Sequence, residues 1–167
     1  MSALADAAAE ADALAEAGDE RALADLRAQW GDDVEAAARS TDPRLRAEAY
    51  LAIGRFRFRQ KIELLRRGLS DGGAAIRGSS LLALELLSRD HPGVVNGFRP
   101  LLHELVSHDP NVPVRRLGVV ALKNGSPDRA TIAILEGLGA NDEEPRELRE
   151  TAAKVAQGLR RKAGPSK

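Results

Sequence analysis

The chain has 167 residues with 25 basic and 25 acidic side chains, so its formal net charge at neutral pH is zero. It contains no cysteine, which excludes disulfide bonds and thiolate metal ligands and fits a reducing compartment. No apolar run approaches the roughly 20 residues of a membrane-spanning helix, and the acidic N-terminal stretch lacks the basic start of a secretory signal. We therefore expect a cytoplasmic protein without membrane segments.

The first 39 residues predict helices, but their spacing matches the regular pattern of the later residues poorly. An alanine-rich helix is expected over residues 3–17, with Gly18 as its stop, because alanine is the best helix former. Apolar spacing predicts a second helix over 20–30, a break at Gly31 and a further short helix to Arg39. We assign residues 1–39 to an N-terminal helical cap or a divergent first repeat.

Charge is distributed unevenly despite the neutral total. Residues 1–35 carry ten acidic side chains against only Arg21 and Arg27, whereas residues 39–67 carry nine basic side chains against three acidic ones. Such asymmetry reflects either the choice of a partner or mutual attraction between neighbouring segments. The sequence leaves both explanations open.

One short pattern returns four times: an aliphatic residue is followed directly by arginine, and an aspartate lies a few positions upstream. The intervals between successive arginines are 31, 38 and 34 residues. Self-similarity at this period is typical of stacked helical hairpins, because one hairpin cannot bury its apolar face alone. We therefore predict an all-α chain built as an α-solenoid of antiparallel helix hairpins. The pattern consists of Asp42 and Arg46, Asp71 and Arg77, Asp109 and Arg115, and Asp142 and Arg149.

Second helices are expected between the arginine-bearing ones, because aliphatic residues recur there every three or four positions. Helix starts are predicted at three aspartate–proline or serine–proline pairs, where a side chain can cap the first turn. The longest interval, 38 residues, contains residues 89–93, and we place its extra length in a loop there. A final helix is expected over about 144–162, followed by a flexible tail at 163–167. The predicted starts are Asp42-Pro43, Asp109-Pro110 and Ser126-Pro127.

The run from Asp71 through Ile76-Arg77 to Ala83-Leu84 resembles the HEAT repeat, particularly its phycobilisome-lyase-like variety. The resemblance covers about residues 40–156, and we assign residues 40–162 to HEAT-like repeats, which implies a solenoid of about four to five repeats. It also implies that the aspartates and arginines of the pattern form a structural ladder of ionic and hydrogen-bonded links between adjacent repeats. The fourth copy departs from the pattern, because Asp142 and Arg149 are further apart than the other pairs.

A metal or catalytic site finds little support in the sequence. Deoxyhypusine hydroxylases, a HEAT-repeat family, bind iron through His-Glu pairs just after the repeat arginine, but the equivalent positions here begin with Ala47-Glu48 and Gly78-Ser79 and hold no histidine. His103-Glu104 is the nearest candidate, and we interpret His103 as a helix-surface or helix-end residue. No phosphate-binding glycine motif occurs. We expect no enzymatic activity, no metal and no cofactor.

The segment from Gly54 to Lys61 is the first choice for an interaction surface, because arginine and phenylalanine alternate in it. Such side chains could grip phosphates and stack on bases or on a partner's side chains. In the alternative interpretation, the phenylalanines anchor a turn in the core while the arginines face water or the acidic N-terminal helices. The predicted partner-binding residues are Tyr50, Arg55, Phe56, Arg57, Phe58, Arg59 and Lys61, together with Arg116 and Lys123 on the exposed face of an arginine-bearing helix.

The leading functional hypothesis is a non-catalytic scaffold or adaptor that binds another protein through the concave and rim surfaces of the solenoid. Nucleic-acid binding through the basic 39–67 segment is the alternative, although the neutral net charge does not favour it. A further alternative, handling of a chromophore as a lyase or chaperone, follows only from the family resemblance.

Overall fold

The computed structural model describes residues 2–165. Within this range the chain forms ten α-helices and one 3-10 turn and no strand, which confirms the all-α class. None of these helices combines the length and apolar character needed to span a membrane. The chain divides into two compact units, Met1–Leu87 and Ser88–Lys167. The predicted division at residue 39 falls inside the first unit, between its second and third helices.

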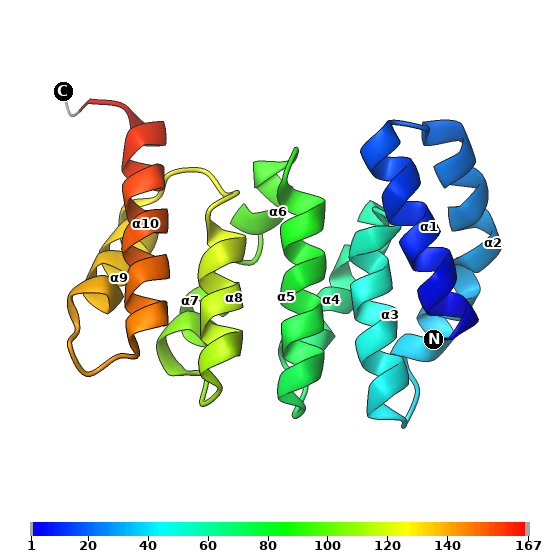
Figure 1. The fold of residues 1–167 in the computed structure, drawn as a ribbon, viewed down its shortest axis with the longest axis horizontal. Coiled ribbons are helices and arrows are strands. Elements are labelled where there is room, and N and C mark those ends of the chain that lie inside the picture. Colours follow the sequence, from blue (N-terminus) through cyan, green and yellow to red (C-terminus); the bar gives the residue numbers. More distant parts are fainter. Residues whose placement is uncertain (1, 166–167) are drawn as a thin grey trace. The chain divides into compact units, whose positions relative to one another are not determined.

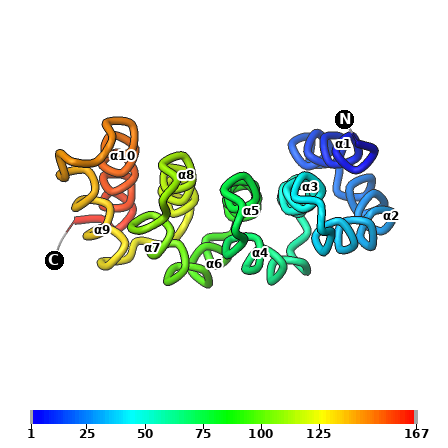
Figure 2. Tube along the Cα trace, turned by 90° about the horizontal axis from the view of Figure 1, so that it is seen from below, coloured from blue at the N-terminus to red at the C-terminus, as the bar shows by residue number. Residues whose placement is uncertain are grey.

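The first unit packs five helices and the 3-10 turn. Helices α3 and α5 lie side by side, α4 lies in a layer beneath them, and α1 lies against α2 and α3 (Figures 1 and 2). The last residue of α5 already belongs to the second unit. The elements are α1 (Ala3–Ala17), α2 (Glu20–Ala38), α3 (Pro43–Arg55), η1 (Arg59–Lys61), α4 (Ile62–Leu69) and α5 (Ala74–Ser88).

Helix α2 corrects the predicted break at Gly31, because it continues through this residue to Ala38. A glycine inside a helix costs only about 1 kcal/mol relative to alanine. The turns beyond Gly31 offset this cost by burying Val34 and Ala38 in the core of the unit. Tertiary packing therefore overrides the local stop signal.

Two glycines allow the helices of the first unit to approach closely. A Cβ atom on Gly54 of α3 would lie 2.4 Å from the Cα of Ala83 in α5, so only glycine fits this contact. A Cβ on Gly68 of α4 would lie 2.1 Å from the Ser80 hydroxyl and 3.0 Å from the Tyr50 ring. Gly54 lies within α3 and serves as a packing position.

The second unit contains a short helix and two helical hairpins. Helices α8 and α10 form one layer, and α7 and α9 form the other (Figures 1 and 2). The short helix α6 was not predicted, since its first residues were placed in a loop. The elements are α6 (Pro92–Asn96), α7 (Arg99–His108), α8 (Val112–Leu122), α9 (Arg129–Ala140) and α10 (Arg146–Ala163).

Helix caps confirm one predicted start and correct two others. Asp42 caps α3 as expected, accepting a hydrogen bond of 2.9 Å from the backbone N–H of Arg44. Helix α8 is instead capped by Asn111 and helix α9 by Asp128, each two residues later than predicted. The predicted tail begins within α10 at Ala163, and residues 166–167 lie outside the described part of the chain.

Candidate interaction surfaces

Two of the repeat arginines, Arg46 and Arg77, brace the turns that precede their own helices. Arg46 donates from Nη1 to the carbonyls of Ser40 and Thr41 at 3.0 and 3.2 Å. Arg77 makes the same two bonds, at the same distances, to the carbonyls of Asp71 and Gly72. In both cases the acceptors lie six and five residues before the arginine. The two side chains therefore perform the same structural task.

This geometry corrects the equivalence of Asp42 and Asp71. The residue six positions before the arginine closes a turn by accepting an N–H from two residues further on: Ser40 from Asp42 at 3.0 Å, and Asp71 from Gly73 at 2.9 Å. Asp109 accepts in the same way from Asn111 at 2.9 Å. Ser40 is thus the structural counterpart of Asp71, whereas Asp42 occupies the cap position.

Two ion pairs join consecutive arginine-bearing helices within a unit. Arg46 on α3 lies 3.1 Å from Asp71, in the turn before α5, so an ion pair links the two helices at that position. Arg115 on α8 donates two hydrogen bonds, of 2.7 and 2.8 Å, to Glu144 rather than to the predicted Asp142. Asp142 is almost fully exposed and lies 3.7 Å from Arg149. Glu144 therefore supplies the acid of the fourth copy.

Both acids of these links are held in their charged form. Burial raises the pKa of Asp71, but hydrogen bonds from the Gly73 N–H and from Arg46 outweigh this effect, so the net pKa is lowered. The hydrogen bonds from Arg115 lower the pKa of Glu144 against the opposing effect of burial. The links are therefore complete at neutral pH.

The aromatic rings of the predicted interaction segment belong to the core. Phe56 and Phe58 are 0% and 5% exposed, and their ring centroids are 5.2 Å apart. Tyr50 is 3% exposed, and burial raises the pKa of its hydroxyl. This burial overturns the prediction that the three rings form a partner-binding surface. The alternative interpretation, in which the phenylalanines anchor the turn after α3, describes them correctly.

The acidic N-terminal helices dock on the basic segment. Arg57 donates to Asp12 at 2.9 Å and to Glu16 at 3.3 Å, both on α1. Lys61 donates to Glu35 on α2 at 2.6 Å and lowers the pKa of that carboxyl. These ion pairs neutralise part of the charge imbalance of the sequence within the unit.

Only part of the predicted basic surface remains accessible. Among the described residues, Arg55 and Arg59 have no ion-pair partner; Arg55 is half-buried and Arg59 is exposed. Lys61, in contrast, lies 5.3 Å from the centroid of the Phe58 ring in addition to its pair with Glu35. The segment therefore offers Arg55 and Arg59 to a partner, while Arg57 and Lys61 are engaged internally.

A mixed-charge face remains exposed on α8 and α10. Arg116 is exposed and donates to the Thr151 hydroxyl at 3.1 Å, which links the two helices. Lys123 follows the last residue of α8 with an exposed side chain, and its carbonyl accepts a hydrogen bond from Lys162. Lys154 is exposed on α10. Of the predicted partner-binding residues, Arg116 and Lys123 are thus placed where a partner can reach them.

His103 takes part in a contact that the sequence did not indicate. Its Nε2 lies 2.7 Å from the hydroxyl of buried Thr131, which donates to the carboxylate of Asp128 at 3.0 Å. Burial lowers the pKa of His103, although the charge of Asp128 opposes this effect. No group of three potential metal ligands gathers anywhere in residues 2–165. His103 thus joins α7 to the start of α9.

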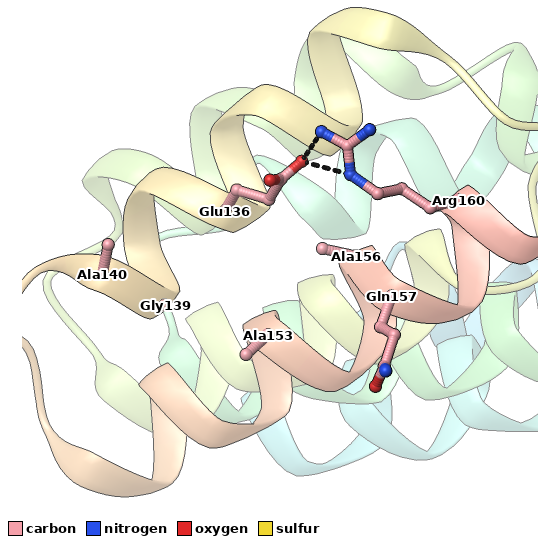
Figure 3. Close-up of a pocket in the computed structure, with 7 residues that line it drawn as sticks. All are labelled: Glu136, Gly139, Ala140, Ala153, Ala156, Gln157 and Arg160. Carbon is pink, nitrogen blue, oxygen red and sulfur yellow. Dashed lines mark hydrogen bonds and ion pairs between the residues drawn. The ribbon is translucent and has the colours of Figure 1, made fainter. Parts of the chain in front are cut away.

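A hollow of about 340 Å³ lies between α9 and α10 (Figure 3). The small side chains of Ala140 and Ala153 line it, and an ion pair between Glu136 and Arg160 bridges the two helices. A Cβ on Gly139 would lie 3.2 Å from that of Ala153, so the helices are close at this point. Small residues on two neighbouring helices correspond to this hollow in the sequence, but their spacing alone did not predict it.

Comparison with known proteins does not assign the chain to a family. No family model matches the sequence, and no curated protein or solved structure matches it significantly.

Proposed function

We propose that this chain is a HEAT-like α-solenoid that acts as a non-catalytic scaffold or adaptor for another protein. The observation that carries this proposal is the shared bonding of Arg46 and Arg77, which brace equivalent turns through two carbonyls each. Identical use of the same residue in successive hairpins is what a stack of repeats requires. The arginines therefore have a structural role in the stack, and other side chains bind the partner.

The exposed face of α8 and α10 is the proposed partner surface. Arg116, Lys123 and Lys154 contribute positive charges, and Glu150 on α10 contributes a negative one. A surface of mixed sign suits a folded protein that carries complementary charges, since such pairs steer and orient association. We define these four residues as the α8–α10 face.

A charge-reversal experiment tests this surface. The double variant Arg116→Glu and Lys154→Glu is compared with wild type in affinity capture from the native cell, with the captured proteins quantified by mass spectrometry. The matched control is Arg44→Glu with Arg129→Glu, which makes the same charge change at exposed positions outside the face. Selective loss of one protein with the face variant alone supports the proposal. Equal capture by wild type and the face variant overturns it.

Nucleic-acid binding through residues 39–67 is a second candidate. It is favoured by Arg39, Arg44, Arg59 and Arg67, which are exposed and have no ion-pair partner among residues 2–165. Binding to several phosphates would weaken steeply as salt rises, because counterions are released on association. Titration of labelled single-stranded DNA at low and moderate salt tests this candidate, and binding that is absent or independent of salt removes it.

A further inference from the structure

Helix α1 is held on the first unit by few large apolar side chains. Its buried residues are Leu4 and three alanines, Ala7, Ala8 and Ala11. Leu14, its other large apolar residue, is only half-buried. Because the hydrophobic contribution scales with the apolar area removed from water, alanine methyl groups anchor a helix weakly. Helix α1 is therefore suited to local undocking while the remaining core stays folded.

The polar contacts of α1 are more specific than its apolar ones. Asp12 and Glu16 lie one helical turn apart, and both are bound by the guanidinium of Arg57. The same guanidinium donates to the carbonyls of Gly54 and Arg55 at 2.9 and 3.2 Å, which fixes its position independently of α1. Arg57 thus forms a receptor for two carboxylates that are spaced one turn apart on a helix.

The backbone of Arg57 adopts a conformation that usually requires glycine. Its φ is +55°, and within residues 2–165 it is the only non-glycine residue with positive φ. It ends α3 with two backbone bonds of 3.0 Å, from the Arg57 N–H to Gly54 and from the Phe58 N–H to Ile53. A residue without a Cβ would adopt this turn with less strain. An arginine at this position supplies the side chain that reaches α1.

The connection after α1 allows the helix to move without disturbing α2. Gly18 ends α1 with φ of +73°, and Asp19 caps α2 by accepting from the Ala22 N–H at 3.2 Å. The two helices are therefore capped separately. Release of α1 needs a change at Gly18 but no unwinding of α2.

We propose that the seat of α1, formed by Arg57 and the surfaces of α2 and α3 beneath the helix, is a docking site for an acidic amphipathic helix of a partner protein. Helix α1 occupies this site as an internal competitor. A partner helix that fits this site has a stripe of alanine and leucine side chains and two carboxylates one turn apart. This inference rests on the proposed role in protein binding but concerns a different surface from the α8–α10 face.

A peptide of residues 2–18 is the probe for this site. Its binding to the full-length chain is measured by fluorescence anisotropy, and hydrogen exchange reports the protection of α1 and α5. The variant Asp12→Asn with Glu16→Gln loses the carboxylates of the internal competitor but keeps Arg57. We expect faster exchange in α1, unchanged protection of α5, and peptide affinity higher by roughly tenfold, because the competent open state is more populated.

Two further variants separate recognition from simple loosening. Arg57→Gln also frees α1 but removes the receptor, so it should show faster α1 exchange without a gain in peptide affinity. The pair Asp6→Asn and Glu10→Gln makes the same charge change at exposed positions of α1 that have no ion-pair partner among the described residues, and it should behave like wild type. Equal peptide binding by the Arg57 variant and the Asp12/Glu16 variant overturns the proposal.

Failure of the α1 docking site can be distinguished from failure of the α8–α10 face. If the Asp12/Glu16 variant keeps α5 protected but binds the peptide no better than wild type, the seat is not a docking site, and capture through the α8–α10 face is unaffected by this result. If the peptide binds as expected but the face variant captures normally, the α8–α10 face is wrong and the α1 seat stands.

Discussion

Arg46 on α3 places its Nε 3.1 Å from the Oδ2 of Asp71, in the turn that precedes α5. The same guanidinium holds the carbonyls that end the preceding turn, at Ser40 and Thr41. One side chain therefore satisfies the backbone of its own hairpin and binds the acid of the next. Arginine suits this position because its guanidinium has enough donors to make both contacts at once.

Replacement of Arg46 by alanine should lower the free energy of unfolding by about 1–3 kcal/mol, because Asp71 and two carbonyls lose their donor. Urea denaturation at neutral pH measures the change. The control is Arg44→Ala on the same helix, where the side chain is exposed and has no ion-pair partner in residues 2–165. That variant should stay within about 0.5 kcal/mol of wild type. Equal effects of the two variants would contradict the role given to Arg46.

Glu144 should make the stability depend on pH in the acid range. Its pKa is lowered from 4.5, chiefly by the hydrogen bonds from Arg115. Since the folded-state pKa is lower than the unfolded one, the stabilisation is complete above the ordinary value and is lost as the pH falls through the folded value. Glu144→Gln should therefore reduce the unfolding free energy at pH 7 and flatten its decline below 4.5.

Glu147→Gln provides the comparison for this prediction, because Glu147 is exposed on α10 and has no ion-pair partner among the described residues. Urea titrations of the three proteins at several pH values measure the effect. A decline of the same steepness in wild type and in Glu144→Gln would show that the Arg115 pair contributes nothing to acid stability.

Two glycine substitutions should change stability in opposite directions. Gly54→Ala brings a Cβ within 2.4 Å of the Ala83 Cα, so α3 and α5 must separate. Overpacking of this kind costs about 1–3 kcal/mol and should lower the melting temperature. Gly137 lies within α9, and a Cβ there meets nothing within 4 Å. Gly137→Ala should therefore raise the melting temperature, with a gain of about 1 kcal/mol from helix propensity. A higher melting temperature for Gly54→Ala would be inconsistent with the described packing.

Substitutions of Phe56 and Arg59 should affect the unfolding free energy very differently, because one side chain is in the core and the other is on the surface. Phe56→Ala removes a fully buried ring and should cost about 3–5 kcal/mol. Arg59→Ser changes an exposed side chain and should alter the unfolding free energy by less than about 0.5 kcal/mol. Chemical denaturation measures both. A stable, fully folded Phe56→Ala protein would restore the surface interpretation of the ring.

Local signals predicted much of the helical framework correctly. Alanine content and Gly18 located α1, and the four aliphatic–arginine steps located α3, α5, α8 and α10, because capping and apolar periodicity act within a few residues. The same local signals gave a wrong break at Gly31, where burial of the following turns in the core keeps α2 continuous. They also equated Asp42 with Asp71, because both aspartates accept an N–H from two residues further on and differ only in their position relative to the arginine.

The sequence by itself determined the helical class, the period of the pattern and the imbalance between an acidic N-terminus and a basic segment, because these depend on composition and spacing along the chain. Only the tertiary structure decided what the pattern contacts: Phe56 in the core, Arg57 against Asp12 and Glu16, and Arg115 against Glu144. Such pairings join residues from 29 to 45 positions apart. They depend on how helices pack, and local spacing carries no information about them.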